Sequence, residues 1–176
     1  ESAGMHTVSV LLPAVAVGAI VACTTPAGAG GAPIVATLES RSGSAVQGVV
    51  RLQRRRDGIR LRATVTGLPP DSEHGFHIHE HGDCSASDAA SAGGHFNPTG
   101  APHGRFGVGA HHAGDLPSLR SNARGIARID VTLRDVAWDG PQGVVGRSVI
   151  VHANPDDFTT QPTGNSGARI ACAVLR

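Results

Sequence analysis

Short apolar runs separated by turn-forming residues are the feature that most constrains the fold of this chain. From Pro33 onward the sequence shows no convincing helical period, and residues that favour β-strands recur between glycines and prolines. Arg56 to Gly58 has the composition of a hairpin turn. We expect strands at Ile34–Ser40, Val46–Gln53, Ile59–Thr66, Gly75–Glu80, Leu116–Ser121, Gly125–Thr132, Arg147–His152 and Arg169–Leu175. This pattern predicts an all-β fold, an eight-stranded Greek-key β-sandwich or flattened barrel.

Two connections in this pattern are too long to serve only as links between strands. They cover residues 81–115 and 153–168. Loops of this length inside a compact domain are usually functional. The first belongs to a stretch, Gly75 to Asp115, that holds most of the ten histidines of the chain.

The histidines of this stretch have the spacing of metal ligands. In the run from Phe76 to His79, apolar residues and histidines alternate, so a strand places both imidazoles on one face. Imidazole suits zinc, copper, iron and nickel. Further candidate ligands follow in a segment rich in glycine and proline, which we interpret as a ligand-bearing loop: His95, His103, His112 and Asp115.

These residues are too many for one metal ion, which takes three or four such ligands. His152 adds another candidate, because it ends an apolar strand pattern that could return beside His77 and His79. The sequence therefore predicts two adjacent metal sites that share a ligand.

The ordered motifs identify a resemblance. They are His77-x-His79, Gly94-His95-Phe96-Asn97-Pro98, His103-Gly104, His112-x-x-Asp115, Gly146-Arg147 running into Val151-His152, and Gly164-Asn165-x-Gly167-x-Arg169-x-x-Cys172. From about Pro33 to the C-terminus the chain resembles the copper,zinc superoxide dismutases. The resemblance implies an enzyme that dismutates superoxide to dioxygen and hydrogen peroxide.

The resemblance also implies a role for each residue. Copper would be bound by His77, His79, His95 and His152, and zinc by His95, His103, His112 and Asp115. The ring of His95 would bridge the two metals and supply a proton. Arg169 would dock the superoxide anion, and Asp156 would accept hydrogen bonds from one histidine of each metal site. An all-imidazole set suits redox-active copper, and a set with one carboxylate suits structural zinc.

The segment before the domain predicts export. Val8 to Ala22 is apolar but short for a membrane span, and residues 24–32 have the composition of a linker. We therefore expect a signal peptide at 1–23, a linker at 24–32 and the dismutase domain at 33–176. Ile20 to Cys23 resembles a bacterial lipobox, which would make Cys23 a lipidated anchor in the cell envelope. The alternative is a plain cleaved signal with an incidental cysteine, since no basic residue precedes the apolar run.

The other two cysteines, Cys84 and Cys172, are expected to form a disulfide. They are an even pair in an exported, oxidising context, and the resemblance implies a bridge at this place. Such a bridge would fasten the metal-bearing loop to the last strand.

Composition excludes some partners and leaves others open. The 176 residues fit one domain, and the formal net charge of +1 offers no reason to propose a nucleic-acid partner. Membrane contact is expected only through the lipid anchor, and the protein is expected to be a monomer or a homodimer. The loop at 153–168 contains no basic residue, so attraction of superoxide must rely on the metals, Arg169 and arginines elsewhere, such as Arg105.

Several alternatives stay open. His111 could compete with His112, although only the latter has the His-x-x-Asp spacing, and His81 could bind a metal weakly. We interpret His6 and His74 as incidental and Asp157 as a surface charge. A non-catalytic copper- and zinc-binding or copper-delivery protein on the same fold is the rival to the enzyme, and a copper-only enzyme conflicts with His103 and Asp115.

Overall fold

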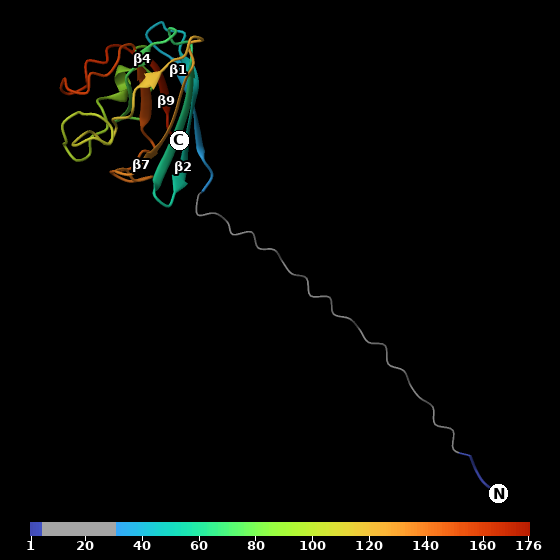
Figure 1. The fold of residues 1–176 in the computed structure, drawn as a ribbon. Coiled ribbons are helices and arrows are strands. Elements are labelled where there is room, and N and C mark those ends of the chain that lie inside the picture. The colour runs from blue at the N-terminus through green and yellow to red at the C-terminus, as the bar shows by residue number, and fades with distance from the viewer. Residues whose placement is uncertain (5–30) are drawn as a thin grey trace.

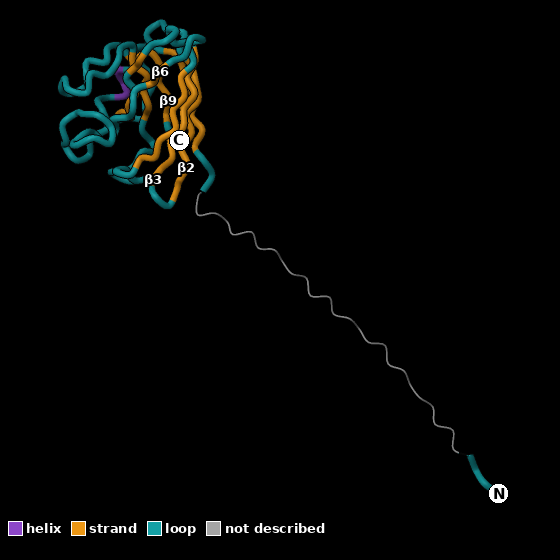
Figure 2. The backbone as a smooth tube through the Cα atoms, in the orientation of Figure 1, coloured by secondary structure: helices purple, strands orange, loops and turns teal. Residues whose placement is uncertain are grey.

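The structure is a computed structural model that describes residues 1–4 and 31–176. Its main feature is a curled sheet of seven antiparallel strands in the order β5-β8-β9-β1-β2-β3-β7 (Figures 1 and 2). These strands are β1 Ile34–Ser40, β2 Gln47–Arg55, β3 Gly58–Thr66, β5 Phe76–His79, β7 Ala127–Leu133, β8 Ser148–His152 and β9 Arg169–Val174. Two short strands, β4 Glu73–His74 and β6 Leu119–Arg120, pair with each other, and Ala90–Ala92 form one 3₁₀ turn.

The sheet curls because β1 divides its pairing between two neighbours. Its first part, Ile34 to Leu38, pairs with β2, whereas Glu39 and Ser40 pair with β9. A strand that changes partner along its length turns the sheet through a corner. The curled sheet wraps around the larger of two apolar clusters, whose members in the described ranges 1–4 and 31–176 all lie between Ile34 and Leu175. Residues 34–175 therefore contain an extensive core of their own.

Strand β3 shows why these residues form a half-buried sheet. Ile59, Leu61, Ala63 and Val65 are buried, and the residues between them face outward. This alternation matches the period of two in a β-strand. Shifting the strand by one residue would move the whole apolar set to the solvent face, so the alternation specifies the register.

Strands β5 and β8 differ from β3 because every residue in them is buried. Phe76 and Ile78 belong to the core, while His77 and His79 lie on the other face of β5. The two long connections, residues 80–118 and 153–168, cover that face. Loops rather than a second sheet therefore shield the histidines from water.

A disulfide joins Cys84 in the first long connection to Cys172 in β9, as expected, with the Cα atoms 5.8 Å apart. It packs in a small separate cluster with Ala89, Ala92 and Ile150. The bridge closes a loop across 88 residues of sequence, which corresponds to about 4.6 kcal/mol of stabilisation in the chain-entropy treatment. It ties a loop with little core of its own to the centre of the sheet.

The expected strands are confirmed with small shifts at their ends. The largest difference is at Leu116–Ser121, where only Leu119 and Arg120 form a strand, and the short partner strand β4 was not expected. Both are too short for an apolar alternation to reveal. The turn between β2 and β3 lies at Arg56 and Asp57, as expected.

Some expectations lie outside the described residues. They are most of the signal peptide, Cys23, nearly all of the linker, and His6. Among residues 1–4 and 31–176, no helix is long and apolar enough to cross a membrane.

Candidate metal centre

Three of the candidate ligands come from strands of the sheet. His77 and His79 lie on the same side of β5, and His152 ends the neighbouring strand β8. The pairing of β8 with β9 shifts its register between Val151 and His152. An irregularity of this kind re-aims a side chain. It occurs where His152 has to meet the two histidines of β5.

The other ligands reach the site because the first long connection returns along β5. Strand β5 is at one end of the sheet order, so one of its edges has no strand partner. Isolated bridges on that side pair His77 with Asp115 and His79 with His95. The loop thereby covers an exposed edge and delivers a carboxylate and an imidazole beside the strand-borne histidines.

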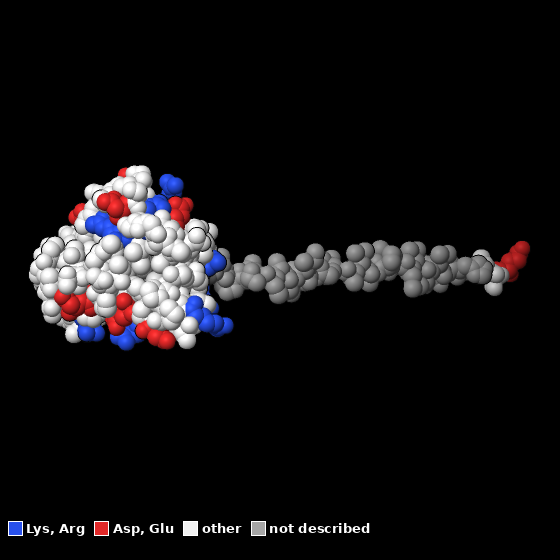
Figure 3. Space-filling view, turned by 90° about the horizontal axis from the view of Figure 1, so that it is seen from above, with Lys and Arg blue, Asp and Glu red and all other residues white. Residues whose placement is uncertain are grey.

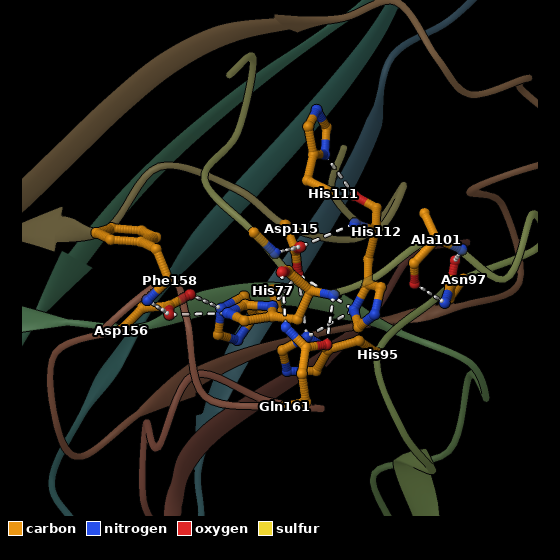
Figure 4. Close-up of polar contacts among 12 residues, drawn as sticks. His77, His95, Asn97, Ala101, His111, His112, Asp115, Asp156, Phe158 and Gln161 are labelled. Atoms are coloured by element: carbon orange, nitrogen blue, oxygen red, sulfur yellow. Dashed lines mark hydrogen bonds and ion pairs between the residues drawn. The ribbon is translucent and has the colours of Figure 1, made fainter. Parts of the chain in front are cut away.

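One set of four atoms has the dimensions of a tetrahedral metal site. Oδ1 of Asp115 lies 3.1 Å from Nδ1 of His95, 2.9 Å from Nδ1 of His103 and 3.5 Å from Nδ1 of His112. Nδ1 of His112 is also 3.4 Å from Nδ1 of His95. Zinc–nitrogen bonds of about 2.0 Å give a tetrahedral edge of about 3.3 Å. Figure 4 shows Asp115, His95 and His112 converging, and the donor set fits zinc.

A second set has ring nitrogens that face each other without a proton between them. Nε2 of His79 lies 3.3 Å from Nε2 of His152. The Nδ1–H of each ring donates to a backbone carbonyl, at 3.0 Å to Gly93 and at 3.2 Å to Gly167. This assignment leaves two lone pairs directed at the same point, an arrangement that a cation stabilises.

Two further ring nitrogens complete this second set. Nδ1 of His77 and Nε2 of His95 are buried and have no hydrogen-bond partner in the described part of the chain. A buried polar atom without a partner costs free energy unless something binds it. Because all four atoms lie within 4.8 Å of one another, they fit a copper ion held by four imidazoles. His95 belongs to both sets.

Asp156 connects the two sets. Its Oδ2 lies 2.7 Å from Nε2 of His77, and its Oδ1 lies 2.9 Å from Nε2 of His103 (Figure 4). A carboxylate on the outer nitrogen of a ligating imidazole fixes both the orientation and the tautomer of the ring. One side chain from the second long connection thus orients a histidine in each set.

Hydrogen bonds between a side chain of one long connection and the backbone of the other hold the two connections together. The side-chain amide of Gln161 accepts a hydrogen bond from the His103 N–H at 2.8 Å and donates to the His103 carbonyl at 3.0 Å. Gly164 has a φ of +64°, and a Cβ at this position would collide with Asp156 and His103. Glycine is therefore required for the approach of this loop.

Burial and charge set the protonation of the ligands. Burial lowers the pKa of His79, lowers that of His95 to about 4 and lowers that of His152 to about 3, so these imidazoles are neutral at pH 7. Neutral imidazole is the form that binds metals. Burial would also lower the pKa of His103, but hydrogen bonds with Asp115 and Asp156 outweigh it and raise the pKa to about 9.

The two carboxylates remain ionised across the physiological range. Burial would raise their pKa values, but hydrogen bonds from histidines hold both of them well below the usual range. The other oxygen of Asp115 accepts the backbone N–H groups of Gly104 at 3.0 Å and His112 at 2.9 Å. This leaves Oδ1 of Asp115 facing the three imidazoles.

Arg169 lies beside the four-imidazole set. Its guanidinium donates to the carbonyls of Ala89 and Gly93, both at 2.7 Å. The Gly93 carbonyl also accepts the hydrogen bond from His79, so Arg169 and a candidate ligand share an acceptor. Burial lowers the pKa of Arg169, but an arginine keeps its charge at neutral pH.

Of the remaining described histidines, two lie outside both sets of candidate ligands, and the third, His74, contacts the backbone of a candidate ligand. His111 hydrogen-bonds the His112 carbonyl and points away from the cluster (Figure 4), and His81 belongs to neither set. His74, expected to be incidental, is buried and bonds the His152 carbonyl at 2.9 Å and the Ser72 hydroxyl at 2.8 Å. No spacing in the sequence could reveal this contact, because its acceptor is 78 residues away.

The surface residues named from the sequence also have clear places. Asp157 is exposed and accepts hydrogen bonds from Thr159 and Thr160, which lower its pKa to about 2. Arg105 stacks over Phe158 of the second long connection at 4.0 Å, so it adds a positive charge to a loop that has none of its own.

Fold and site together define a class of protein: a β-barrel metalloprotein with two histidine-rich sites that share one imidazole. Comparisons with known proteins agree with this class. Residues 46–175 match the model of the copper/zinc superoxide dismutase family, and the chain belongs to this family. It is an oxidoreductase that uses copper and zinc to convert superoxide into dioxygen and hydrogen peroxide.

Similar proteins come from bacteria and from animals. Superoxide dismutase (Cu-Zn) 2 of Aquifex aeolicus is 38% identical over 136 residues, which cover 74% of this chain and 80% of that protein. An extracellular superoxide dismutase (Cu-Zn) of Brugia pahangi is 35% identical over 153 residues, 82% of this chain and 75% of that protein. A SOD-like protein from Bacillus subtilis superimposes with a TM-score of 0.72 at 35% identity, covering 81% of this chain and 97% of that chain. The relatives thus include an extracellular dismutase, which is compatible with export.

Proposed function

We propose that this dismutase binds its two metals in two sets of four residues, one metal in each set. Copper is bound by His77, His79, His95 and His152, and zinc by His95, His103, His112 and Asp115. The observation that carries this assignment is the close approach of each set around a shared His95. The all-imidazole set serves a metal that changes oxidation state, and the set with a carboxylate serves one that does not.

The residues of the chain then have three roles in the reaction, of which proton transfer is the first. When bound, copper supplies the one-electron oxidation of one superoxide and the one-electron reduction of the next, and zinc supplies a fixed positive charge. His95 takes up a proton on Nε2 during one half of the cycle and gives it to the reduced product, which takes its second proton from water and leaves as hydrogen peroxide. In the metal-free protein, burial lowers the pKa of His95 to about 4, so its imidazole holds a proton weakly.

Arg169 has the second role, which is to hold the substrate anion. Two carbonyl acceptors fix its guanidinium beside His79, and a guanidinium offers further N–H donors to an anion. Asp156 has the third role, because it orients His77 and His103 and, through them, both metals.

We further propose that the protein is exported and that lipidation of Cys23 anchors it to the membrane of a bacterial cell envelope. The lipobox-like sequence from Ile20 to Cys23 supports the anchor, and the Cys84–Cys172 disulfide fits an oxidising compartment. Mass spectrometry of the N-terminal peptide tests the anchor, because a plain cleaved signal would leave Cys23 unmodified. Sedimentation of the soluble domain decides between a monomer and a homodimer.

The residue roles are tested by the decay of a superoxide pulse in the presence of residues 24–176 loaded with one copper and one zinc. We expect Arg169→Ala to slow the decay about tenfold, since a charge-assisted hydrogen bond is lost. The exposed Arg124→Ala variant is the control and should retain the full rate. Equal rates in all three proteins would overturn the role of Arg169, and no decay above that of free copper would leave a non-catalytic metal-binding protein.

A further inference from the structure

Eight of the fifteen arginines lie on β2, β3 or β7, in the turn between β2 and β3, or directly after β7. Three of them form ion pairs: Arg60 with Asp130, Arg54 with Asp139, and Arg134 with Asp57. The other five are exposed and form no ion pair with any residue in the described ranges 1–4 and 31–176. We call these five the arginine face: Arg51, Arg55, Arg56, Arg62 and Arg128.

The register of the sheet places these charges side by side. Arg51 of β2 is directly opposite Arg62 of β3, and Arg128 of β7 is opposite Thr64, one step along the same face. Side chains directly opposite each other on one face of an antiparallel pair have Cβ atoms about 5 Å apart. Two like charges at that distance repel each other. Asp130 of β7, directly opposite Arg62, offsets part of this repulsion, whereas the residues opposite Arg51 are Val35 and Arg62.

A shallow depression separates the two opposed arginines. It is lined by Val49, Arg51, Arg62, Ala63 and Thr64. All five lining residues belong to β2 and β3, so the depression lies on the sheet itself and both arginines border it. An anionic group of small size can contact both cations there, because each guanidinium presents several N–H donors.

The chain enters the domain next to this face. Ile34, the first residue of β1, pairs with Leu52, and Val35 pairs with Arg51. Figure 3 shows blue side chains on the side of the domain from which the chain enters. Eleven residues lead from Cys23 to Ile34, which span at most about 40 Å. A lipid on Cys23 would therefore keep the arginine face within that distance of the membrane.

The metal centre is on another side of the molecule. Its strand-borne ligands come from β5 and β8, which are at the opposite end of the sheet order from β3 and β7. Figure 1 shows the two ligand-bearing connections projecting away from β1 and β2. Contact between the arginine face and a flat surface would leave the metal centre open to solvent.

We propose that the arginine face docks on anionic phospholipid headgroups of the membrane that carries the anchor. Anionic headgroups complement the positive charge of this face. The chain also enters the domain beside it, so an anchor at Cys23 would bring the face close to the membrane. This inference rests on the proposed anchor at Cys23 for bringing the face to the membrane. Docking holds the anchored enzyme in one orientation, with the site for superoxide facing away from a surface that repels anions.

The test measures binding to vesicles in the absence of any anchor. Residues 24–176, loaded with copper and zinc and not lipidated, are mixed at low salt with vesicles of phosphatidylglycerol and phosphatidylcholine, or of phosphatidylcholine alone. We expect binding only to the anionic vesicles. Arg51→Gln combined with Arg62→Gln should weaken it about 25-fold, since each basic residue near an anionic surface contributes a factor of about five.

A matched control removes the same number of charges elsewhere. Arg120→Gln combined with Arg124→Gln alters exposed arginines outside the arginine face, and this variant should bind anionic vesicles nearly as well as the parent. Both variants should keep the full dismutase rate, because all four side chains are at the surface and away from the metal centre. The Arg51→Gln/Arg62→Gln variant should unfold at a temperature no lower than that of the parent, since it removes a like-charge pair, and the control loses only the exposed Arg120–Glu73 ion pair.

Three results would overturn the proposal. They are equal binding to neutral vesicles, equal weakening in the control variant, and tighter binding to a soluble polyanion such as dextran sulfate than to vesicles of the same charge. A change in oligomeric state in the Arg51→Gln/Arg62→Gln variant would instead assign the face to a second copy of the chain and would also overturn it. Because the tested protein has no lipid, these results do not depend on whether Cys23 is modified.

Discussion

The two metal sites of this protein are built from different kinds of structure. The proposed copper set takes three of its four ligands, His77, His79 and His152, from strands that are buried on both faces. Two residues of the proposed zinc set, His103 and His112, are in an irregular loop. The pairing of the sheet sets the positions of the strand-borne ligands. The positions of the loop-borne ligands depend on contacts that the loop makes with the rest of the protein.

The contacts that hold the loop are few and specific. Asp115 accepts two backbone N–H groups of its own loop, Gln161 holds His103 through two hydrogen bonds, and the Cys84–Cys172 bridge fastens the start of the loop. We therefore expect zinc and the disulfide to order the loop, and we expect the copper ligands to hold their positions without either. Four changes, given from the largest expected effect to the smallest, test this difference.

The largest effect is expected from Asp115→Ala. This change removes a zinc ligand and the acceptor for two backbone groups, and we expect about 4 kcal/mol less stability, or roughly 10 °C in unfolding temperature. Hydrogen exchange should accelerate across residues 81–115 and stay slow in β5 and β8. Uniform acceleration through the whole sheet would contradict the difference between the two sites.

Loss of a strand-borne ligand should instead affect activity more than structure. His152→Ala should lower the dismutase rate by more than about 100-fold, which exceeds the usual effect of losing an outer-shell partner. Metal analysis should find copper reduced and zinc retained. Loss of both metals from this variant would mean that the two sites are not built independently.

His74 supports His152, one of the strand-borne ligands, through a hydrogen bond to its backbone carbonyl. Replacing it with phenylalanine leaves the His152 carbonyl and the Ser72 hydroxyl without this partner, and we expect about 2 kcal/mol less stability. The dismutase rate should fall by less than it does in His152→Ala. The His111→Gln variant serves as the control and should leave both unfolding temperature and rate unchanged.

The smallest effect is a difference in pH dependence. In the zinc-free protein the raised pKa of His103, about 9, favours a bound proton below that pH, and zinc has to displace it. Zinc affinity should therefore fall about tenfold for each pH unit between 9 and 7 on account of this group. His152, with a pKa lowered to about 3, has no proton to lose in that range. Calorimetry in buffers of different ionisation enthalpy measures the protons released, and equal release from the parent and from His103→Asn would refute the assignment.

The same proton has a consequence for stability. Because the folded pKa of His103 is raised above its unfolded value, its contribution to the stability of the zinc-free protein is complete below about pH 6.5 and is lost as the pH rises through about 9. Asp115 and Asp156 behave in the opposite sense, since their pKa values are depressed. Their contribution is present above about pH 4 and is lost as the pH falls.

Much of this fold could be predicted from local patterns. The alternation in β3 specifies both a strand and its inward face, and the His-x-His spacing in β5 specifies two imidazoles on one side. Strand β4 could not be predicted in the same way, because two residues are too few to show a period, and the strand expected at Leu116–Ser121 is limited to the two residues of β6. The role of His74 was also missed, since it depends on a carbonyl that is distant in sequence.

By itself, the sequence determined the strand pattern, the identity of the candidate ligands and the pair of cysteines available for a bridge, because each depends on residue type and short-range spacing. Only the tertiary structure decided which ring nitrogens converge, that Asp156 contacts one histidine of each set, and that four arginines without ion pairs in the described chain, Arg51, Arg55, Arg62 and Arg128, project from one face of the sheet. These features join residues from distant parts of the chain. Their geometry is set by strand pairing and loop packing, which no local pattern records.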